Sequence, residues 1–320
     1  MNHKIEKHII VTGGAGFIGS HLVELLLKHN YYVTVLDNFD PFYARSIKEE
    51  NVSSYSSHPN VTFLELDICD EVALNLHLQG VYFAIIHLAA KAGVRPSINN
   101  PIPYQQVNVA GTQNLLEFAR RKGIQQFVFA SSSSVYGVNK NIPWQESDGL
   151  LNPISPYAST KISGELMGHV YSHLFGIRFI ALRFFTVFGP RQRPDLAIHL
   201  FSKKILSGES IEFFGDGSTK RDYTYVDDIV NGIFSALHYT ATNFEIINLG
   251  NSHTISLKEL LSTLELVLQK KANIVLYPEQ PGDVSITYSD ISKAKKLLDY
   301  KPATNFLSGI EKFRDWLVQQ

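Results

Sequence analysis

Short apolar runs alternate with amphipathic stretches over the first half of the chain. Runs at 9–11, 32–36, 61–66, 81–88 and 126–130 predict buried strands. Apolar residues at helical spacing follow the first run, a long amphipathic helix is predicted over 103–122, and the polar segment 40–60 predicts a helix and a loop. Strands that alternate with helices in this way predict an α/β fold with a doubly wound parallel sheet.

The second half is richer in turn residues and shorter elements. From residue 184 on, prolines and glycines such as Pro190, Gly208 and Gly215 predict a smaller substrate-binding part that reaches residue 320. Helices are predicted at 226–237, 258–269 and 291–298, and a strand at 246–249. We expect residues 226–250 to return to the first domain, 1–183, so that this domain is formed by two separate segments of the chain.

Composition narrows the functional class. The chain has 320 residues, of which 44% are hydrophobic and 18% charged, as in globular proteins that fold in water. A net charge of −1 gives no electrostatic case for nucleic acid or an anionic membrane. The single cysteine, Cys69, excludes an internal disulfide and a cysteine-based zinc site. We see neither a signal peptide nor a membrane span, and we expect a cytoplasmic enzyme without a metal.

A strand, a glycine-rich turn and a helix follow one another in residues 9–27. The turn contains two overlapping spacings, Gly14-x-Gly16-x-x-Gly19 and Gly13-x-x-Gly16-x-x-Gly19. Glycines let the backbone approach a pyrophosphate, and the amide groups at the helix start face its charge. An ordinary tight turn is the alternative, and the flanking strand and helix favour a Rossmann-type dinucleotide site.

Asp37 ends the second predicted strand, 18 residues after Gly19. A dinucleotide fold places the acid that binds the adenosine ribose hydroxyls near this position. A carboxylate there repels a 2′-phosphate, so Asp37 favours NAD over NADP. The alternative is a turn aspartate that only ends a strand.

The fourth predicted strand ends in small residues. Ala89 and Ala90 would let a cofactor lie against the backbone, although tight packing explains them equally well. His87 lies within the apolar run, and we interpret it as a buried histidine with satisfied hydrogen bonds rather than as a catalyst.

The fifth predicted strand runs into four serines, residues 131–134, at the predicted mouth of the cofactor crevice. Farther on, Ser155 suits a helix N-cap and Pro156 the first helical position, which places Tyr157 and Lys161 one turn apart on one helix face. A serine cluster is usually a solvated loop, and a Tyr-x-x-x-Lys pair also arises by chance. Their place in a dinucleotide fold therefore carries the argument.

Tyr157 beside Lys161 offers proton transfer next to a nicotinamide. A free tyrosine has a pKa of about 10, which is too high for a base at neutral pH. A lysine ammonium and the positive nicotinamide ring both favour the phenolate. Tyr157 could then take a proton from a substrate hydroxyl as hydride leaves the same carbon, while Ser132 or Ser134 holds that oxygen.

With these residues the chain resembles an extended short-chain dehydrogenase/reductase, in the branch of NAD-dependent nucleotide-sugar epimerases. The resemblance covers almost the whole chain, and its motifs occur in order: TGGAGFIG, DN, DI, HLAA, NVAGT, SSSSVYG, YASTK, RFFTVFGPR, GDG, RDY and PGD. It implies that NAD is surrounded by Gly13, Gly16, Phe17, Ile18, Gly19, Asp37, Asn38, Asp67, Ile68, Leu88, Ala89, Ala90, Asn108, Tyr157 and Lys161.

The resemblance also implies a reaction. Ser132, Tyr157 and Lys161 would be the catalytic set. Hydride would pass from C4 of the sugar to bound NAD⁺, a 4-ketose would form and turn over, and hydride would return to the opposite face. Dehydratase and decarboxylase relatives carry an acid after the serine or threonine of the fifth strand, where this chain has Ser133 and Ser134. An epimerase is therefore favoured over a dehydratase.

For the substrate, the resemblance implies a UDP-sugar. Arg221 would clamp the phosphates, Asp283 a ribose hydroxyl, and Thr186 would face the sugar or its diphosphate. A local ion pair with Asp222 is the alternative for Arg221. Gln280 stands where relatives often have a second phosphate-binding arginine.

Three stretches, 37–43, 92–97 and 184–195, look more like UDP-glucuronate 4-epimerases than UDP-glucose 4-epimerases. A guanidinium can pair two-pronged with a C6 carboxylate, and Arg193 is the first candidate for that role, Arg95 the second. A solvated basic loop is the alternative for Arg191 and Arg193. UDP-glucuronate is the leading substrate, and UDP-glucose or its N-acetylated analogue the alternative.

Two further expectations follow from the resemblance. The helices at 103–122 and from Tyr157 onward are the pair that relatives use in a four-helix dimer interface, which implies a homodimer. A protein that binds NAD without catalysis is the rival class, and the intact set of Ser132, Tyr157 and Lys161 favours an enzyme.

Overall fold

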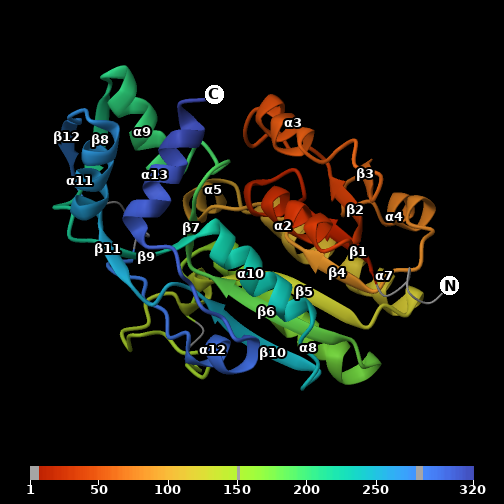
Figure 1. Ribbon diagram of the computed structural model, residues 1–320. Coiled ribbons are helices and arrows are strands. Elements are labelled where there is room, and N and C mark those ends of the chain that lie inside the picture. Colours follow the sequence, from red (N-terminus) through yellow and green to blue (C-terminus); the bar gives the residue numbers. More distant parts are fainter. Residues whose placement is uncertain (1–6, 150–151, 279–283) are drawn as a thin grey trace.

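A seven-stranded parallel sheet with helices on both faces forms the centre of the molecule (Figure 1), as the sequence predicted. The computed structural model describes residues 7–149, 152–278 and 284–320. The strand order is β10-β6-β5-β4-β1-β2-β3, and every neighbouring pair is parallel. The strands are β1 (His8–Thr12), β2 (Tyr32–Asp37), β3 (Val61–Glu65), β4 (Ala84–His87), β5 (Gln126–Ser132), β6 (Arg178–Phe184) and β10 (Phe244–Leu249).

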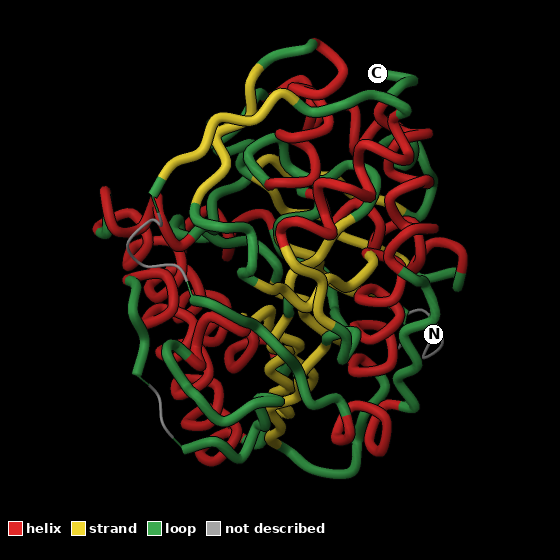
Figure 2. The backbone as a smooth tube through the Cα atoms, turned by 90° about the vertical axis from the view of Figure 1, so that its left-hand side faces the viewer, coloured by secondary structure: helices red, strands yellow, loops and turns green. Residues whose placement is uncertain are grey.

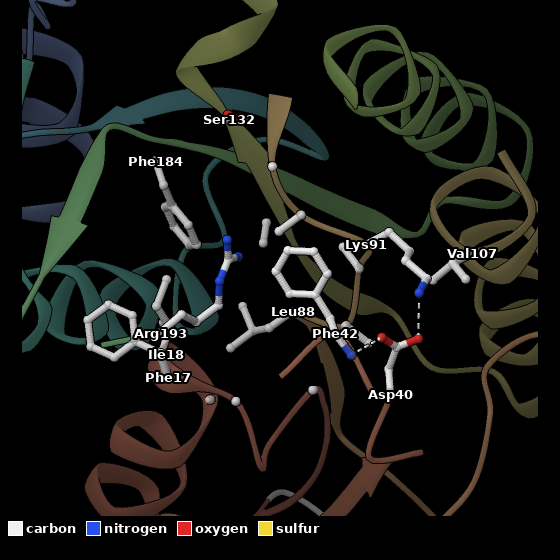
Figure 3. A pocket seen from close by; sticks show the side chains of 18 of the residues that line it. Phe17, Ile18, Asp40, Phe42, Leu88, Lys91, Val107, Ser132, Phe184 and Arg193 are labelled. Atoms are coloured by element: carbon white, nitrogen blue, oxygen red, sulfur yellow. Dashed lines mark hydrogen bonds and ion pairs between the residues drawn. The ribbon is translucent and has the colours of Figure 1, made fainter. Parts of the chain in front are cut away.

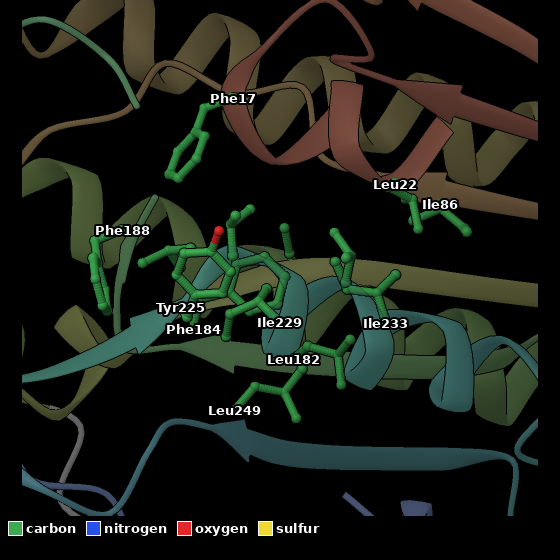
Figure 4. Packing of buried hydrophobic residues seen from close by; sticks show 14 of the residues in the cluster. Phe17, Leu22, Ile86, Leu182, Phe184, Phe188, Tyr225, Ile229, Ile233 and Leu249 are labelled. Carbon is green, nitrogen blue, oxygen red and sulfur yellow. The ribbon is translucent and has the colours of Figure 1, made fainter. Parts of the chain in front are cut away.

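Alternate strand residues point into two hydrophobic cores, one on each face. Ile9 packs in the core under α2 (Phe17–Lys28) and α10 (Val226–Leu237). Ile10 packs in the opposite core, under α4 (Glu71–His77), α7 (Thr112–Lys122) and α8 (Pro156–Phe175). Figure 4 shows Ile229 and Ile233 of α10 over Leu182 of β6. Burial on both faces explains why these strands are apolar runs. Two further helices of this part are α3 (Arg45–Ser53) and α5 (Val94–Asn99).

The segment 102–122 differs from the single helix predicted over 103–122. It consists of α6 (Ile102–Tyr104), a π-helical stretch Gln105–Gly111 and α7. The Thr112 hydroxyl donates to the Asn108 carbonyl oxygen at 2.7 Å, and the Asn108 side chain turns toward Lys91 and Thr160. Side-chain hydrogen bonds thus accompany the widened turn, which a hydrophobic period alone does not reveal.

Two strands also differ from the sequence expectations. The strand predicted at 81–88 is limited to Ala84–His87, because its register on β1 begins with Ala84 opposite Ile9. No strand was predicted at 178–184, where β6 lies between β5 and β10. Since β10 pairs with β6 in parallel, a strand from late in the chain completes the sheet.

Most of the remaining elements gather beyond the carboxyl ends of the large sheet, whereas α12 (Ser292–Leu298) packs against β10 and α10 (Figure 1). They include a three-stranded sheet ordered β11-β9-β7 and a two-stranded sheet of β12 and β8. Their bounds are β7 (Thr186–Phe188), α9 (Ala197–Ser207), β8 (Ser210–Phe214), β9 (Lys220–Tyr225), β11 (Thr254–Ser256), α11 (Leu257–Leu268), β12 (Asn273–Tyr277) and α13 (Phe306–Leu317). The view in Figure 2, turned by 90°, shows the large sheet between helices on either side. Among the described helices, none has the length and apolarity to cross a membrane.

Candidate functional site

A cavity of about 490 Å³ opens at the carboxyl ends of β1, β2, β4 and β5 (Figure 3). Parallel sheets bind ligands at this edge. The described residues that line it include most of those selected from the sequence. These are Gly13, Gly16, Phe17, Ile18, Gly19, Asp37, Asn38, Asp67, Ile68, Leu88, Ala89, Ala90, Ser132, Ser134, Tyr157, Lys161, Thr186 and Arg193.

The glycine turn between β1 and α2 packs so closely on neighbouring backbone that two of its glycines, Gly13 and Gly19, cannot carry a side chain. A Cβ on Gly13 would lie 2.7 Å from the amide nitrogen of Ala89, and a Cβ on Gly19 would lie 2.1 Å from the carbonyl oxygen of Gly13. Gly13 also has a φ of +73°, which favours glycine. No side chain caps the start of α2, so its first amide groups can meet a phosphate. This cradle fits a dinucleotide.

Replacing Gly19 by alanine is expected to remove bound dinucleotide. The added methyl group would push the turn apart, at a cost of about 1–3 kcal/mol for overpacking. NAD released from the purified protein by denaturation measures the effect. Gly149→Ala is the matched control, because a Cβ at Gly149 meets nothing within 4 Å. Equal NAD content in the two variants would contradict this account of the turn.

Asp37 is buried at the end of β2 with a lysine beside it. Its carboxylate accepts hydrogen bonds from the amide groups of Ala15 and Phe39, and the Lys48 ammonium lies 3.7 Å away. Burial raises the pKa of Asp37, and Lys48 and the two amide groups oppose that rise. Lys48 lies in a polar helix and the sequence analysis missed it. A buried carboxylate needs a counter-charge, and that requirement was the available signal.

A cross-loop ion pair also escaped the sequence analysis. The Lys91 ammonium, after β4, lies 2.7 Å from the Asp40 carboxylate, after β2, and both residues line the cavity (Figure 3). The Phe42 amide group donates to the same Asp40 side chain. The pair therefore ties two loops of the cofactor crevice together.

Asn108 and His87 have structural partners. Asn108 does not line the cavity: its side chain accepts from the Lys91 amide group and donates to the carbonyl oxygen of Lys91 and to Thr160. His87 is buried between the hydroxyls of Thr12 and Thr112, 2.7 and 2.9 Å from its two ring nitrogens. Burial lowers its pKa to about 3, and nearby Lys161 adds to the effect. The interpretation of His87 as a satisfied buried histidine is confirmed.

Ser132, Tyr157 and Lys161 converge where β5 meets α8. Ser155 caps α8 by accepting from the Ala158 amide group, and the Tyr157 amide group donates to the Ser97 hydroxyl. Desolvation raises the pKa of Tyr157, while a hydrogen bond with Ser132 and the charge of Arg193 lower it. Burial lowers the pKa of Lys161 to about 7. The Ser132 hydroxyl donates to Ser134 at 3.1 Å.

Arg193 brings a guanidinium into the same cavity from the loop before α9. Figure 3 shows it pointing between Phe184 and Leu88. Its Nε and Nη2 atoms form a bidentate ion pair with the Asp195 carboxylate, at 2.9 and 2.7 Å. Its Cζ atom lies 5.2 Å from the centroid of the Phe42 ring. Burial lowers the pKa of Arg193, and Asp195 outweighs that effect and raises it. An arginine held in this way still has N–H groups to offer a second anion.

A second cavity of about 520 Å³ adjoins the first, and Leu196 lines both. Arg95 and Arg221 line the second cavity rather than the first. The Arg95 guanidinium lies 5.8 Å from the centroid of the Phe214 ring. Asp222 is buried and accepts from the amide groups of Asn251, Ser252 and Ser289. Asp283 and Gln280 lie outside the described residues.

The chain is similar to known proteins over almost its whole length. The family model described as GDP-mannose 4,6 dehydratase matches residues 10–313. A UDP-glucuronate 4-epimerase of Thermodesulfobacterium geofontis is 39% identical over 97% of this chain and 95% of its own length.

Solved structures with the same fold carry nucleotide sugars. A UDP-glucuronic acid 4-epimerase of Bacillus cereus, in complex with UDP-glucuronic acid and NAD, superposes with a TM-score of 0.90 at 38% identity, covering 98% of this chain and 99% of that one. A UDP-glucose 4-epimerase of Thermotoga maritima with UDP-glucose has a TM-score of 0.89 at 31% identity, with the same coverage.

Proposed function

The chain belongs to the GDP-mannose 4,6-dehydratase family of extended short-chain dehydrogenases/reductases, and on this premise we propose that it is an NAD-dependent UDP-glucuronate 4-epimerase. Its product would be UDP-galacturonate. One observation carries the proposal: a glycine cradle, a Ser-Tyr-Lys set and a partly buried arginine line a single cavity. The two relatives described above at 38–39% identity are UDP-glucuronate 4-epimerases by name.

Residues 1–183, with 226–250, would bind NAD, and 184–320 would bind the UDP-sugar. The glycine turn would hold the pyrophosphate, and Asp37 would bind the adenosine ribose. When bound, NAD⁺ supplies the acceptor and then the donor of the hydride. The carboxylate of Asp37 disfavours a 2′-phosphate, while Lys48 keeps that carboxylate charged despite its burial.

Tyr157 performs the proton transfer in this proposal. Its phenolate takes the proton from the O4 hydroxyl of the sugar and returns it after the 4-keto intermediate has turned over. Ser132, which is hydrogen-bonded with the Tyr157 phenol, holds the same oxygen. The Lys161 ammonium lies 5.9 Å from the centroid of the Tyr157 ring and stabilises the phenolate.

Arg193 would select a uronic acid. Asp195 already pairs with one edge of its guanidinium, so the remaining N–H groups can bind the C6 carboxylate. Arg95 and Arg221 would bind the diphosphate in the adjoining cavity, where Phe214 offers an aromatic face to the uracil ring.

The positions of the acids argue against dehydration. The described acids that line the first cavity are Asp37 at the end of β2, Asp40 in the loop after it, and Asp67 after β3. Ser132 lies on β5, three strands from β2 and hence about 14 Å away at the usual strand spacing. Asp37 and Asp67 are therefore too far from Ser132 to assist elimination from the 4-keto intermediate, and Asp40 is held in an ion pair by Lys91.

A substrate panel tests the proposal. UDP-glucuronate, UDP-glucose and UDP-N-acetylglucosamine are each incubated with the purified protein, and the products are resolved by chromatography. Conversion of UDP-glucuronate to UDP-galacturonate with the highest kcat/KM is expected. Preference for either neutral sugar would move the assignment to a UDP-hexose 4-epimerase, and a dehydrated product would refute it.

We also propose that the enzyme works in the cytoplasm as a homodimer, with α8 in the interface. Leu166, Val170 and Leu174 are four residues apart on α8, and their exposed fractions are 60%, 48% and 62%. Residues at this spacing form one apolar stripe on a helix. Two copies of α7 and α8 packed in a four-helix arrangement would cover it.

Charges in this stripe are expected to separate the protomers. The variant Leu166→Glu/Leu174→Glu should elute as a monomer in size exclusion with light scattering, whereas the wild type elutes as a dimer. Leu266→Glu is the control, because Leu266 on α11 is 68% exposed and lies outside the proposed interface. A monomeric wild type at micromolar concentration would refute the dimer.

A further inference from the structure

A buried ion pair lies behind the catalytic side chains and joins α8 to β6. The Glu165 carboxylate accepts two hydrogen bonds from Arg183, from Nε at 2.9 Å and from Nη2 at 2.8 Å. The exposed fractions are 3% for Glu165 and 2% for Arg183. The Ser131 hydroxyl donates a third hydrogen bond to Glu165. Neither member of the pair lines the cofactor cavity, so neither touches cofactor or substrate there.

On α8, Lys161 lies between Tyr157 and Glu165, one helical turn from each of them. Its side chain is 4% exposed, and its ammonium donates to the carbonyl oxygen of Ala130 at 2.7 Å. The rings of Phe129 and Tyr157 lie 5.0 and 5.9 Å from the ammonium nitrogen. Oxygen dipoles and aromatic faces cannot replace a counter-charge for a buried ammonium. Glu165 is the carboxylate whose field reaches it.

The charged and titratable groups around this site come from several parts of the chain. Tyr157 and Glu165 lie on α8, His87 on β4 and Arg183 on β6, and Arg193 faces Tyr157 from the loop before α9. Beyond Arg183, the centroid of the Tyr136 ring lies 4.7 Å from the guanidinium carbon, and the charge of Glu146 also acts on Arg183. His87 is neutral, because its pKa is held at about 3.

Glu165 interacts with two positive groups, Lys161 and Arg183. A Tyr157 phenolate would place a second negative charge beside Lys161. Burial lowers the pKa of Lys161 to about 7, and Glu165 opposes this fall. Without Glu165 the ammonium would lose its proton at lower pH, and the phenolate would lose its partner.

We infer that Glu165 is a positioning residue of the proposed reaction, because its buried carboxylate keeps Lys161 charged beside Tyr157. Arg183 and Ser131 fix the carboxylate in place by the three hydrogen bonds described above. The inference rests on the role proposed for Tyr157. It adds Glu165, held by Arg183, to the residues that set the pH range of catalysis.

The pH profile of kcat tests the inference. Glu165→Gln is expected to move the basic limb of the profile to lower pH by about 1–3 units, the size of shift that a nearby opposite charge produces. KM for UDP-glucuronate should stay near its wild-type value, because Glu165 lies outside the cavity. Glu165→Asp is the matched control: it disturbs the same hydrogen bonds but keeps the charge, so its basic limb should stay in place.

Glu165→Gln leaves Arg183 buried without its partner, and the variant can fail to fold. The double variant Glu165→Gln/Arg183→Gln removes both charges. Its basic limb is expected to shift in the same direction but by less, because the loss of Arg183 also removes a positive charge that disfavours the Lys161 ammonium. An unchanged limb in both variants, or an equal shift in Glu165→Asp, would overturn the inference.

A second readout needs no turnover. The near-ultraviolet absorbance of the holoenzyme is titrated with pH, and the same protein with Tyr157→Phe is subtracted, which leaves the phenolate of Tyr157. In the Glu165→Gln background this phenolate should appear at higher pH than in the wild type. Appearance at the same or lower pH would overturn the role of Glu165. Absence of UDP-sugar conversion by the wild type would instead refute the proposed function.

Discussion

Replacement of Tyr157 by phenylalanine is expected to lower kcat for UDP-glucuronate by roughly 10²–10⁴-fold, the usual contribution of a positioned acid or base. The phenol is the group that the structure places next to Ser132 and in front of Lys161. Phenylalanine retains the ring, which packs edge-on against Tyr104 with centroids 6.3 Å apart. The backbone bond from residue 157 to Ser97 also survives the change. The variant should therefore fold and bind NAD as the wild type does.

Two measurements separate chemistry from binding in this variant. Released NAD is quantified after denaturation, and turnover is followed by the ratio of the two uronic acids. Wild-type NAD content with lost turnover is the expected pair of results. Loss of NAD together with turnover would show that Tyr157 has a cofactor-binding role, and undiminished turnover would exclude it as the base.

Replacement of Arg193 by alanine is expected to lower kcat/KM for UDP-glucuronate much more than kcat/KM for UDP-glucose. Hydrogen bonds to a charged group contribute about 1.5–3 kcal/mol, which corresponds to roughly 10–150-fold in kcat/KM. UDP-glucose has a hydroxymethyl group at C6 and offers no carboxylate to the guanidinium. Its kcat/KM should therefore change far less. Parallel kinetics with both substrates measure the difference.

Arg193→Lys is the matched variant, because lysine keeps the charge but lacks the two-pronged geometry. It should fall between the wild type and Arg193→Ala on UDP-glucuronate. An equal loss on both substrates would show that Arg193 supports the site in general, for instance through its pair with Asp195 and its contact with Phe42. The proposal that Arg193 binds the C6 carboxylate would then be refuted.

Local patterns in the sequence were sufficient to predict the sheet and the cofactor crevice. The apolar runs at 9–11 and 32–36 became β1 and β2, because both faces of a parallel sheet are buried. Gly13, Asp37 and Tyr157 lie at strand ends or helix starts, where the chemistry of a site depends on neighbours in sequence. Such features can be recognised without knowledge of distant contacts.

Features that depend on distant contacts were missed or only partly predicted. Lys48 is buried because Asp37, eleven residues earlier, needs a counter-charge, and no periodicity in 40–60 reveals this. The π-helical stretch around Asn108 accompanies side-chain bonds to Lys91 and Thr160. In the sequence, Arg193 and Arg95 were both candidates for binding the carboxylate. Only the folded chain assigns them to different cavities.

The central claim is that NAD stays bound, takes a hydride from C4 of UDP-glucuronate and gives it back. The most direct test is to incubate the purified protein with C4-deuterated UDP-glucuronate in ordinary water, without added cofactor. The account predicts UDP-galacturonate that retains deuterium at C4. Exchange of the label with solvent, or no conversion of UDP-glucuronate while NAD is bound, would contradict it.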